Sequence, residues 1–245
     1  MSAKGTMALA LALGALGAFG GWGCSSADDP APVHRSAVER GAALFRDPRL
    51  SANTTNAFSC DTCHATSAAD ARKLPGASLA GVTARPTFWG GAERDLLASV
   101  DACMRYFMLD ATGLPRGDAR TDAVYAYLAS LPAVAPVAQP FTVVYEPKDL
   151  PPGDAGRGAN VYAGACSRCH GAVSTGVGRI PPSSILPDDT VSEHGAYGPV
   201  ELRRTFVEKV RHGGFLGYGG QMPPFSREAL SDAELSDLLS FFKTY

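Results

Sequence analysis

The chain has 245 residues, of which 45% are hydrophobic and 19% are charged. It carries 22 Lys and Arg residues against 24 Asp and Glu residues, which gives a formal net charge of −2 at pH 7. This composition is typical of a globular protein and excludes a disordered chain, and no basic excess suggests a nucleic-acid partner. The only long apolar stretch lies at the N-terminus, which excludes a multi-span membrane protein.

The first 23 residues are typical of a secretory signal peptide, because Lys4 precedes a short apolar run at residues 7–19. Cys24 then follows Gly23 and precedes small residues, a pattern that resembles a bacterial lipoprotein processing site. That resemblance implies a lipid anchor on Cys24, with ordinary cleavage or an uncleaved anchor as the alternatives. We therefore expect an exported chain on the periplasmic side of a bacterial membrane, with residues 24–35 as a tether.

Two five-residue motifs recur, Cys60-Asp-Thr-Cys63-His64 and Cys166-Ser-Arg-Cys169-His170. An Arg-Gly-Ala stretch precedes each motif, a proline stands eleven residues after each histidine, and an apolar helical run ends each half. Between the halves lies a segment with six prolines, which is incompatible with a continuous helix. The sequence therefore predicts two tandem domains at residues 36–131 and 153–245, joined by a Pro-rich linker at residues 132–152.

Helical patterns dominate both halves. Ser36-x-x-Glu39 and Ser231-x-x-Glu234 are capping boxes that open helices. Apolar residues recur at helical spacing in residues 95–109 and 201–211, and Gly213 is placed to end the second of these. No segment shows sustained strand alternation, so the predicted fold class is all-α.

The Cys-x-x-Cys-His motif is the attachment signal of c-type haem. Two thiols three residues apart on one helical turn reach the two vinyl groups of a porphyrin, and the next histidine points its imidazole at the iron. A four-cysteine zinc site needs no histidine after each pair, and a thioredoxin-like pair expects a βαβ context. The motifs therefore predict two covalently bound haem c groups, on Cys60, Cys63, Cys166 and Cys169, with His64 and His170 as proximal iron ligands.

Both halves resemble small class I c-type cytochrome domains, and together they resemble bacterial diheme cytochromes c. The resemblance implies that Gly41 and Gly158 pack against the last helix of their own half. It also implies that a backbone carbonyl at or beside Pro75 and Pro181 accepts a hydrogen bond from the proximal imidazole, which would fix the ring and raise its basicity.

The sixth iron position is expected to be filled by sulfur. Met222 lies in a Gly-Gly-Gln-Met-Pro-Pro loop, where the family places a distal methionine, so Met222 is the predicted ligand of haem 2. His212 and His194 are the competing ligands. If it is not a ligand, His194 is expected on the surface. For haem 1 we favour Met108, with Cys103 and then Met104 as alternatives. Phe88 and Trp89 are expected to pack on the edge of haem 1.

A diheme electron carrier is the leading functional hypothesis, passing single electrons between redox protein partners at a membrane. The run Cys103-Met-Arg-Tyr-Phe-Met108 also resembles a segment of thiosulfate dehydrogenases, in which a cysteine thiolate can ligate the catalytic haem. That resemblance implies the alternative of an enzyme oxidising a small sulfur anion at haem 1. A diheme peroxidase is a third hypothesis, and it needs a vacant or displaceable sixth position.

Overall fold

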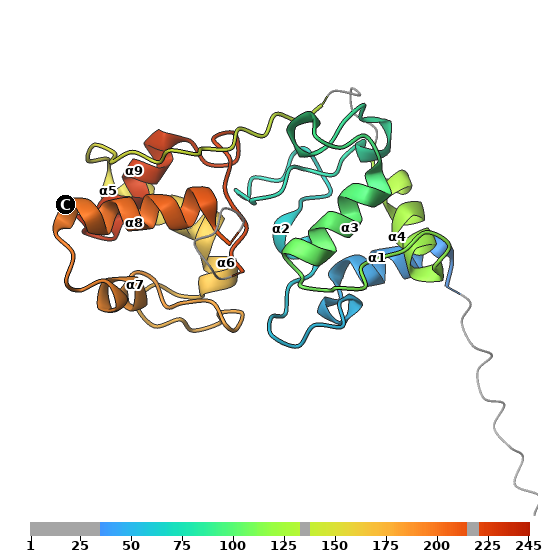
Figure 1. Cartoon of the computed structure of the whole chain (residues 1–245), viewed down its shortest axis with the longest axis horizontal. Coiled ribbons are helices and arrows are strands. Elements are labelled where there is room, and N and C mark those ends of the chain that lie inside the picture. Colours follow the sequence, from blue (N-terminus) through green and yellow to red (C-terminus); the bar gives the residue numbers. More distant parts are fainter. Residues whose placement is uncertain (1–34, 133–137, 215–220) are drawn as a thin grey trace, which may run out of the picture. The chain divides into compact units, whose positions relative to one another are not determined.

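A computed structural model describes residues 35–132, 138–214 and 221–245, and Figure 1 shows their arrangement. The expected signal peptide and Cys24 lie outside the described residues. The α-helices are α1 Ala37–Arg46, α2 Cys60–Cys63, α3 Leu96–Tyr106, α4 Ala119–Ser130, α5 Ala155–Val161, α6 Ser167–His170, α7 Asp188–Glu193, α8 Pro199–His212 and α9 Asp232–Phe241. Within these residues the only β-pairing is an isolated bridge between Phe88 and Glu93. The predicted all-α fold class is confirmed.

The first half is built on the crossing of α1 with α4 (Figure 1). Gly41 lies on the inner face of α1, where a Cβ atom would stand 1.9 Å from the carbonyl oxygen of Ala123 in α4. One turn later the ring of Phe45 packs on that of Tyr127, with 5.3 Å between the ring centroids. The absence of a side chain at Gly41 therefore sets how closely the two helices approach.

The second half repeats this crossing with α5 and α9. A Cβ atom at Gly158 would stand 2.1 Å from the carbonyl oxygen of Asp237. The ring of Tyr162 lies 5.9 Å from that of Phe241 and 5.8 Å from that of Phe242. Both glycines thus pack against the last helix of their own half, as the family resemblance implied.

Most predicted helix boundaries are confirmed by local hydrogen bonds. Both capping boxes form, with Ser36 at the start of α1 and Ser231 at the start of α9, and α8 ends at Gly213. The helix predicted over residues 95–109 is shorter, because α3 begins after its N-cap Asp95 and ends at Tyr106. Leu109, with a φ of 51°, lies in the left-handed region, which a continuing α-helix does not allow.

Residues 138–152 of the predicted linker contain no helix, and hydrogen bonds at residues 142 and 144 join them to the second half. The backbone N–H of Thr142 donates to the Glu228 carboxylate over 2.9 Å, and the Nε2 of His212 donates to the carbonyl of Val144 over 2.7 Å. Residues 133–137 lie outside the described residues. The division into two domains stays a prediction.

Direct contacts join the two halves within Arg35–Tyr245, which packs as one unit. Asp61 and Arg168, which occupy the variable positions of the two Cys-x-x-Cys-His motifs, form an ion pair. The Lys73 ammonium lies 2.5 Å from the Glu234 carboxylate. The two attachment turns therefore lie close together.

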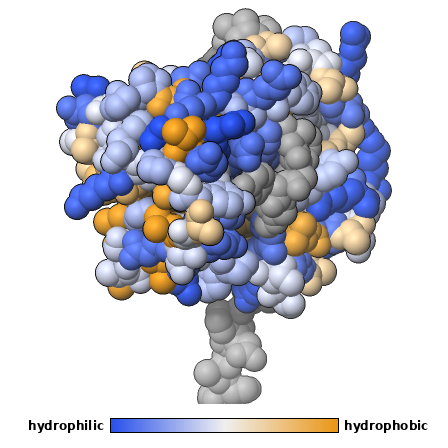
Figure 2. Space-filling view, turned by 60° about the vertical axis from the view of Figure 1, so that its left-hand side comes forward, coloured by the Kyte–Doolittle hydropathy of each residue, from blue (hydrophilic) through white to orange (hydrophobic). Residues whose placement is uncertain are grey.

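The face of the molecule in Figure 2 is mainly polar. Figure 2 shows one face on which hydrophobic residues stand in small groups among hydrophilic ones. None of the helices in the described ranges combines the length and the apolar character that crossing a bilayer requires.

The buried Asp237 carboxylate makes the stability of the second half depend on pH. Its side chain is 7% exposed and accepts hydrogen bonds from the Arg157 guanidinium (2.8 and 2.9 Å) and from the backbone N–H of Asp154 (2.6 Å). The hydrogen bonds from Arg157 lower the pKa of this carboxyl below its ordinary value. A lowered pKa means that the stabilisation is complete above the unfolded-state pKa of about 3.9 and disappears as pH falls through the folded-state value.

We expect Asp237→Asn to lower the free energy of unfolding at pH 7 by about 1–3 kcal/mol, because a buried hydrogen-bond acceptor of Arg157 loses its charge. As pH falls below about 4, the free energy of unfolding of the variant should also decrease less than that of the wild type. Urea denaturation at several pH values measures both effects. Asp122→Asn, on the exposed side of α4, is the matched control, and an equal response of the two variants would contradict this assignment.

Candidate cofactor sites

The first attachment motif is folded as a single helical turn. Ser59 caps α2, with its backbone N–H donating to the Thr62 hydroxyl over 3.0 Å, and Cys60 and Cys63 lie at the two ends of that turn. His64 follows directly as the C-cap. Both thiols and the imidazole therefore leave the backbone within five residues, as attachment to one porphyrin requires.

The second motif reaches the same arrangement by a different local structure. A π-helical turn at Tyr162–Cys166 continues α5, and α6 then carries Cys169 and His170. The Tyr162 hydroxyl donates to the carbonyl of Gly171 over 2.9 Å, which closes the motif against α5. The two motifs thus present the same types of side chain from backbones of different helical geometry.

Both proximal histidines are oriented by a backbone carbonyl. The Nδ1–H of His64 donates to the carbonyl of Ala77 over 2.9 Å, and that of His170 donates to the carbonyl of Ser184 over 2.8 Å. Each Nε2 atom is thereby left as the acceptor nitrogen, which is the form that binds iron. Burial lowers the pKa of both imidazoles, which favours the neutral form.

These acceptors correct the prediction at Pro75 and Pro181. The N–H of Gly76 donates a hydrogen bond to the Cys63 carbonyl. A Cβ atom at Gly76 would stand 2.3 Å from the His64 ring, so only glycine fits there. Pro75 and Gly76 lie beside the imidazole, and the carbonyl that accepts the hydrogen bond from Nδ1 belongs to Ala77. In the second half, Pro181 lies in a turn that is closed by a hydrogen bond from the N–H of Ser183 to the carbonyl of Ile180. The carbonyl that accepts from His170 belongs to Ser184, which follows this turn.

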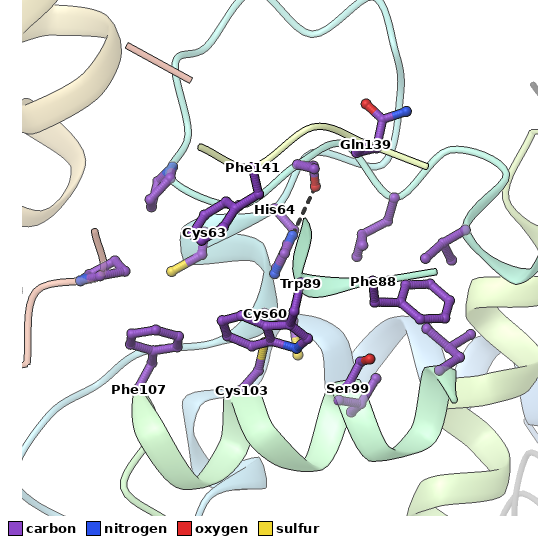
Figure 3. Close-up of a pocket in the computed structure, with 18 of the residues that line it drawn as sticks. Cys60, Cys63, His64, Phe88, Trp89, Ser99, Cys103, Phe107, Gln139 and Phe141 are labelled. Carbon is purple, nitrogen blue, oxygen red and sulfur yellow. Dashed lines mark hydrogen bonds between the residues drawn. The ribbon is translucent and has the colours of Figure 1, made fainter. Parts of the chain in front are cut away.

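The first cavity encloses about 1340 Å³ between α2, α3 and residues 139–141, including the space at its open mouth. Figure 3 shows His64 on one side and Cys103 and Phe107 rising from α3 on the other. Its lining is mainly apolar, and Phe88 and Trp89 belong to it, as expected for contacts with a porphyrin edge. The Trp89 and Phe107 rings stack with 6.0 Å between centroids and 16° between planes.

All three sulfur candidates for the distal position line this first cavity: Cys103, Met104 and Met108. Met104 and Met108 are buried in the core of the first half. Burial raises the pKa of the Cys103 thiol to about 12 and that of Cys60 to about 11, so both sulfurs are thiols here. The lining therefore leaves Met108, Cys103 and Met104 all as candidates for the sixth iron position of the first site.

One buried cationic group in the first cavity has an unpaired nitrogen. The Arg85 guanidinium lines the cavity and donates through Nη2 to the carbonyls of Ser78 and Ala80. Its Nε is buried without a hydrogen-bond partner, which is costly unless an anion completes the site. Haem carries two carboxylates on an apolar macrocycle, so the residues of this cavity fit that group.

The second cavity encloses about 1810 Å³, again including its open mouth, and contains the other predicted ligand set. Cys166, Cys169, His170 and Met222 all line it. The carbonyl of Met222 accepts a hydrogen bond from the N–H of Gly214 over 2.8 Å, which anchors the methionine segment beyond the end of α8. Proximal nitrogen, two thiols and a thioether thus converge on one space.

The two competing histidines of the second half differ in their surroundings. His212 is engaged with the carbonyl of Val144 and does not line the cavity. His194, expected on the surface, lines the cavity with a side chain only 17% exposed and stacks on Tyr197. Its Nε2 lies 3.5 Å from the Glu193 carboxylate and makes no hydrogen bond with the described residues.

The described residues offer no alternative metal centre. They contain no group of three or more His, Cys, Asp or Glu side chains placed to hold a metal ion, and the cysteines at 60, 63, 103, 166 and 169 form no disulfides.

The sequence did not predict that Arg85 and residues 139–141 line the first cavity, or that His194 is buried in the second. Each of these enters a cavity from a segment distant in the chain from the attachment motif it faces, so motif spacing does not reveal it.

Residues 153–242 match the family model described as "Cytochrome C oxidase, cbb3-type, subunit III". No curated protein matches the chain. Among solved structures, the chain is similar to the thiosulfate dehydrogenase TsdBA from Marichromatium purpuratum, with a TM-score of 0.40 and 19% sequence identity. That alignment covers 84% of this chain and 45% of the solved chain, so this chain spans less than half of the solved one.

Proposed function

Because residues 153–242 form a c-type cytochrome domain similar to cbb3-type subunit III, we propose that the whole chain is an exported diheme cytochrome c that carries single electrons. The observation that carries this proposal is the convergence of Cys166, Cys169, His170 and Met222 on one cavity. The equivalent set around Cys60, Cys63 and His64 supports a second haem in the first half.

The bound group would supply one-electron chemistry at iron, and this chain's residues would set its properties. Ala77 and Ser184 orient the imidazoles, the thioether of Met222 favours a high reduction potential, and the apolar walls exclude water. The near-zero net charge favours partner encounters that depend only modestly on salt. Attachment to a membrane through Cys24, on the periplasmic side, belongs to the same proposal.

A second candidate function rests on the position of Cys103. This thiol lines the first cavity together with the attachment cysteines, so oxidation of a small sulfur anion at the first site is the alternative. A peroxidase needs a vacant or displaceable sixth iron position. It is less well supported, because Met222 lines the second cavity and is the candidate ligand for one of the two sixth positions.

The mass of the exported, matured chain tests the proposal. Two porphyrin increments are expected, and their absence from a host competent in haem attachment would end it.

The distal ligands can be separated by substitution. Met222→Leu should keep both porphyrins, because neither thiol nor imidazole changes, and should lose the far-red thioether band of the second site in the oxidised protein. Its reduction potential should fall by at least about 59 mV, a tenfold change in the one-electron equilibrium. Magnetic circular dichroism and a redox titration measure these effects.

At the first site Met108→Leu and Cys103→Ala form a matched pair. Loss of a thioether signal only in Met108→Leu supports the carrier, and a spectral change only in Cys103→Ala supports the sulfur-anion enzyme. An unchanged thioether spectrum in Met222→Leu would contradict the assignment of the second site.

A further inference from the structure

The two cofactor cavities share a wall. Four residues line both of them: Phe58, Cys63, Pro75 and Pro223. A single layer of side chains therefore separates the two sites.

One short segment belongs to both sites. Met222 lines the second cavity, Pro223 lines both, and Pro224 lines the first. The segment that presents the distal sulfur of the second site is therefore also part of the first site's boundary. A displacement of Met222 along this segment would be transmitted to the first cavity, because two consecutive prolines leave the chain few conformations in which to absorb it.

Asn56 connects this segment to the distal side of the first site. Its Nδ2 group donates to the Gln221 side-chain carbonyl over 2.5 Å and to the backbone carbonyl of Phe107 over 3.2 Å. Gln221 precedes Met222, and Phe107 precedes Met108, so one amide group holds the neighbours of both candidate ligands.

The surroundings of Asn56 restrict its freedom to move. Its Oδ1 accepts from the N–H of Phe58 over 3.2 Å, and Phe58 is buried in the shared wall. The Met108 carbonyl is itself held by the Ser51 hydroxyl over 2.8 Å in a buried hydrogen bond. Asn56 itself and the Met108 end of its bridge are thus held by packed residues, which favours the transmission of a displacement over its absorption.

We propose that Asn56, together with the Gln221–Pro224 segment, couples the two cofactor sites, so that the ligand geometry and electron occupancy of one site alter the reduction potential of the other. This inference rests on the proposed diheme function. Coupling of this kind is reciprocal: whatever the first site does to the second, the second does to the first by the same factor.

The test is a spectroelectrochemical titration of the full, matured chain and of three variants. Asn56→Asp keeps the shape of the side chain but removes both donated hydrogen bonds. Gln221→Ala removes the hydrogen bond toward the second site, together with the bond from Gln221 to the Thr55 hydroxyl, and leaves the bond from Asn56 to Phe107. Lys73→Met is the matched control, because it deletes an ion pair between the halves, to Glu234, that touches neither methionine segment. Redox dyes supply one electron to each site, and the far-red thioether band follows the ligands.

We expect Asn56→Asp and Gln221→Ala to change the equilibrium distribution of one electron between the sites by about three- to tenfold, as the loss of one or two hydrogen bonds allows. A tenfold change corresponds to about 59 mV in the separation of the two potentials. Lys73→Met should leave this separation at the wild-type value, even where urea denaturation shows an equal loss of stability.

A wild-type separation in both Asn56→Asp and Gln221→Ala, with two porphyrins present by mass, overturns the coupling and leaves the diheme function standing. An equal shift in Lys73→Met also overturns it, because packing between the halves would then account for the effect. A mass with fewer than two porphyrins contradicts the proposed function itself.

Discussion

The variant Cys60→Ala/Cys63→Ala is expected to mature with one porphyrin fewer and to lose most of the folded structure of residues 36–131. The reason is that the core of the first half is also the wall of its cavity. The residues that belong to both are Phe45, Phe58, Val82, Met104, Met108, Val124 and Leu128.

Without an occupant, these side chains surround an apolar space that no protein atoms fill. A cavity lined by apolar groups loses contacts in proportion to its volume, and a unit of this size has little other apolar surface to bury. The crossing of α1 and α4 at Gly41 alone does not replace that loss.

Far-UV circular dichroism of the double variant, together with its mass, measures the effect. The matched control is Cys103→Ala, which removes a third thiol from the same cavity without touching the attachment motif. We expect the control to keep two porphyrins and the wild-type helical signal. A native spectrum in the double variant would show that the first half folds without the cofactor.

The parts of the fold that the sequence predicted are those fixed by local chemistry. The capping boxes at Ser36 and Ser231 pair residues three apart, and the attachment turns need only five consecutive residues. Gly41 and Gly158 were identified through the family resemblance, and the structure supplies the reason, since no side chain fits at either crossing.

The parts that sequence reasoning missed depend on distant segments. The carbonyls of Ala77 and Ser184, rather than those beside Pro75 and Pro181, meet the imidazoles because of how each loop turns past its ring. The burial of His194 likewise follows from its packing in the second cavity, although its neighbours in the sequence are polar. Neither feature is encoded in a spacing that can be read along the chain.

Gly158→Ala is expected to lower the free energy of unfolding by about 1–3 kcal/mol. The added methyl carbon would stand 2.1 Å from the carbonyl oxygen of Asp237 and 2.7 Å from the Cβ of Phe241. The backbone of α9 cannot rotate away as a flexible side chain would, so α5 and α9 must separate. That separation weakens the packing of Tyr162 on Phe241 and Phe242, which lies next to the second attachment motif.

Gly164→Ala is the matched control in the same half. Gly164 lies in the π-helical turn, and a Cβ atom there would meet no atom within 4 Å. Replacing a helical glycine by alanine in open space should raise stability by about 0.5–1 kcal/mol, because the unfolded chain loses conformational freedom. Urea denaturation of the haem-loaded proteins gives both values. Opposite signs at Gly158 and Gly164 are the expected result, and a gain of stability in both variants would mean that helix propensity, rather than the close approach of α5 and α9, decides the outcome.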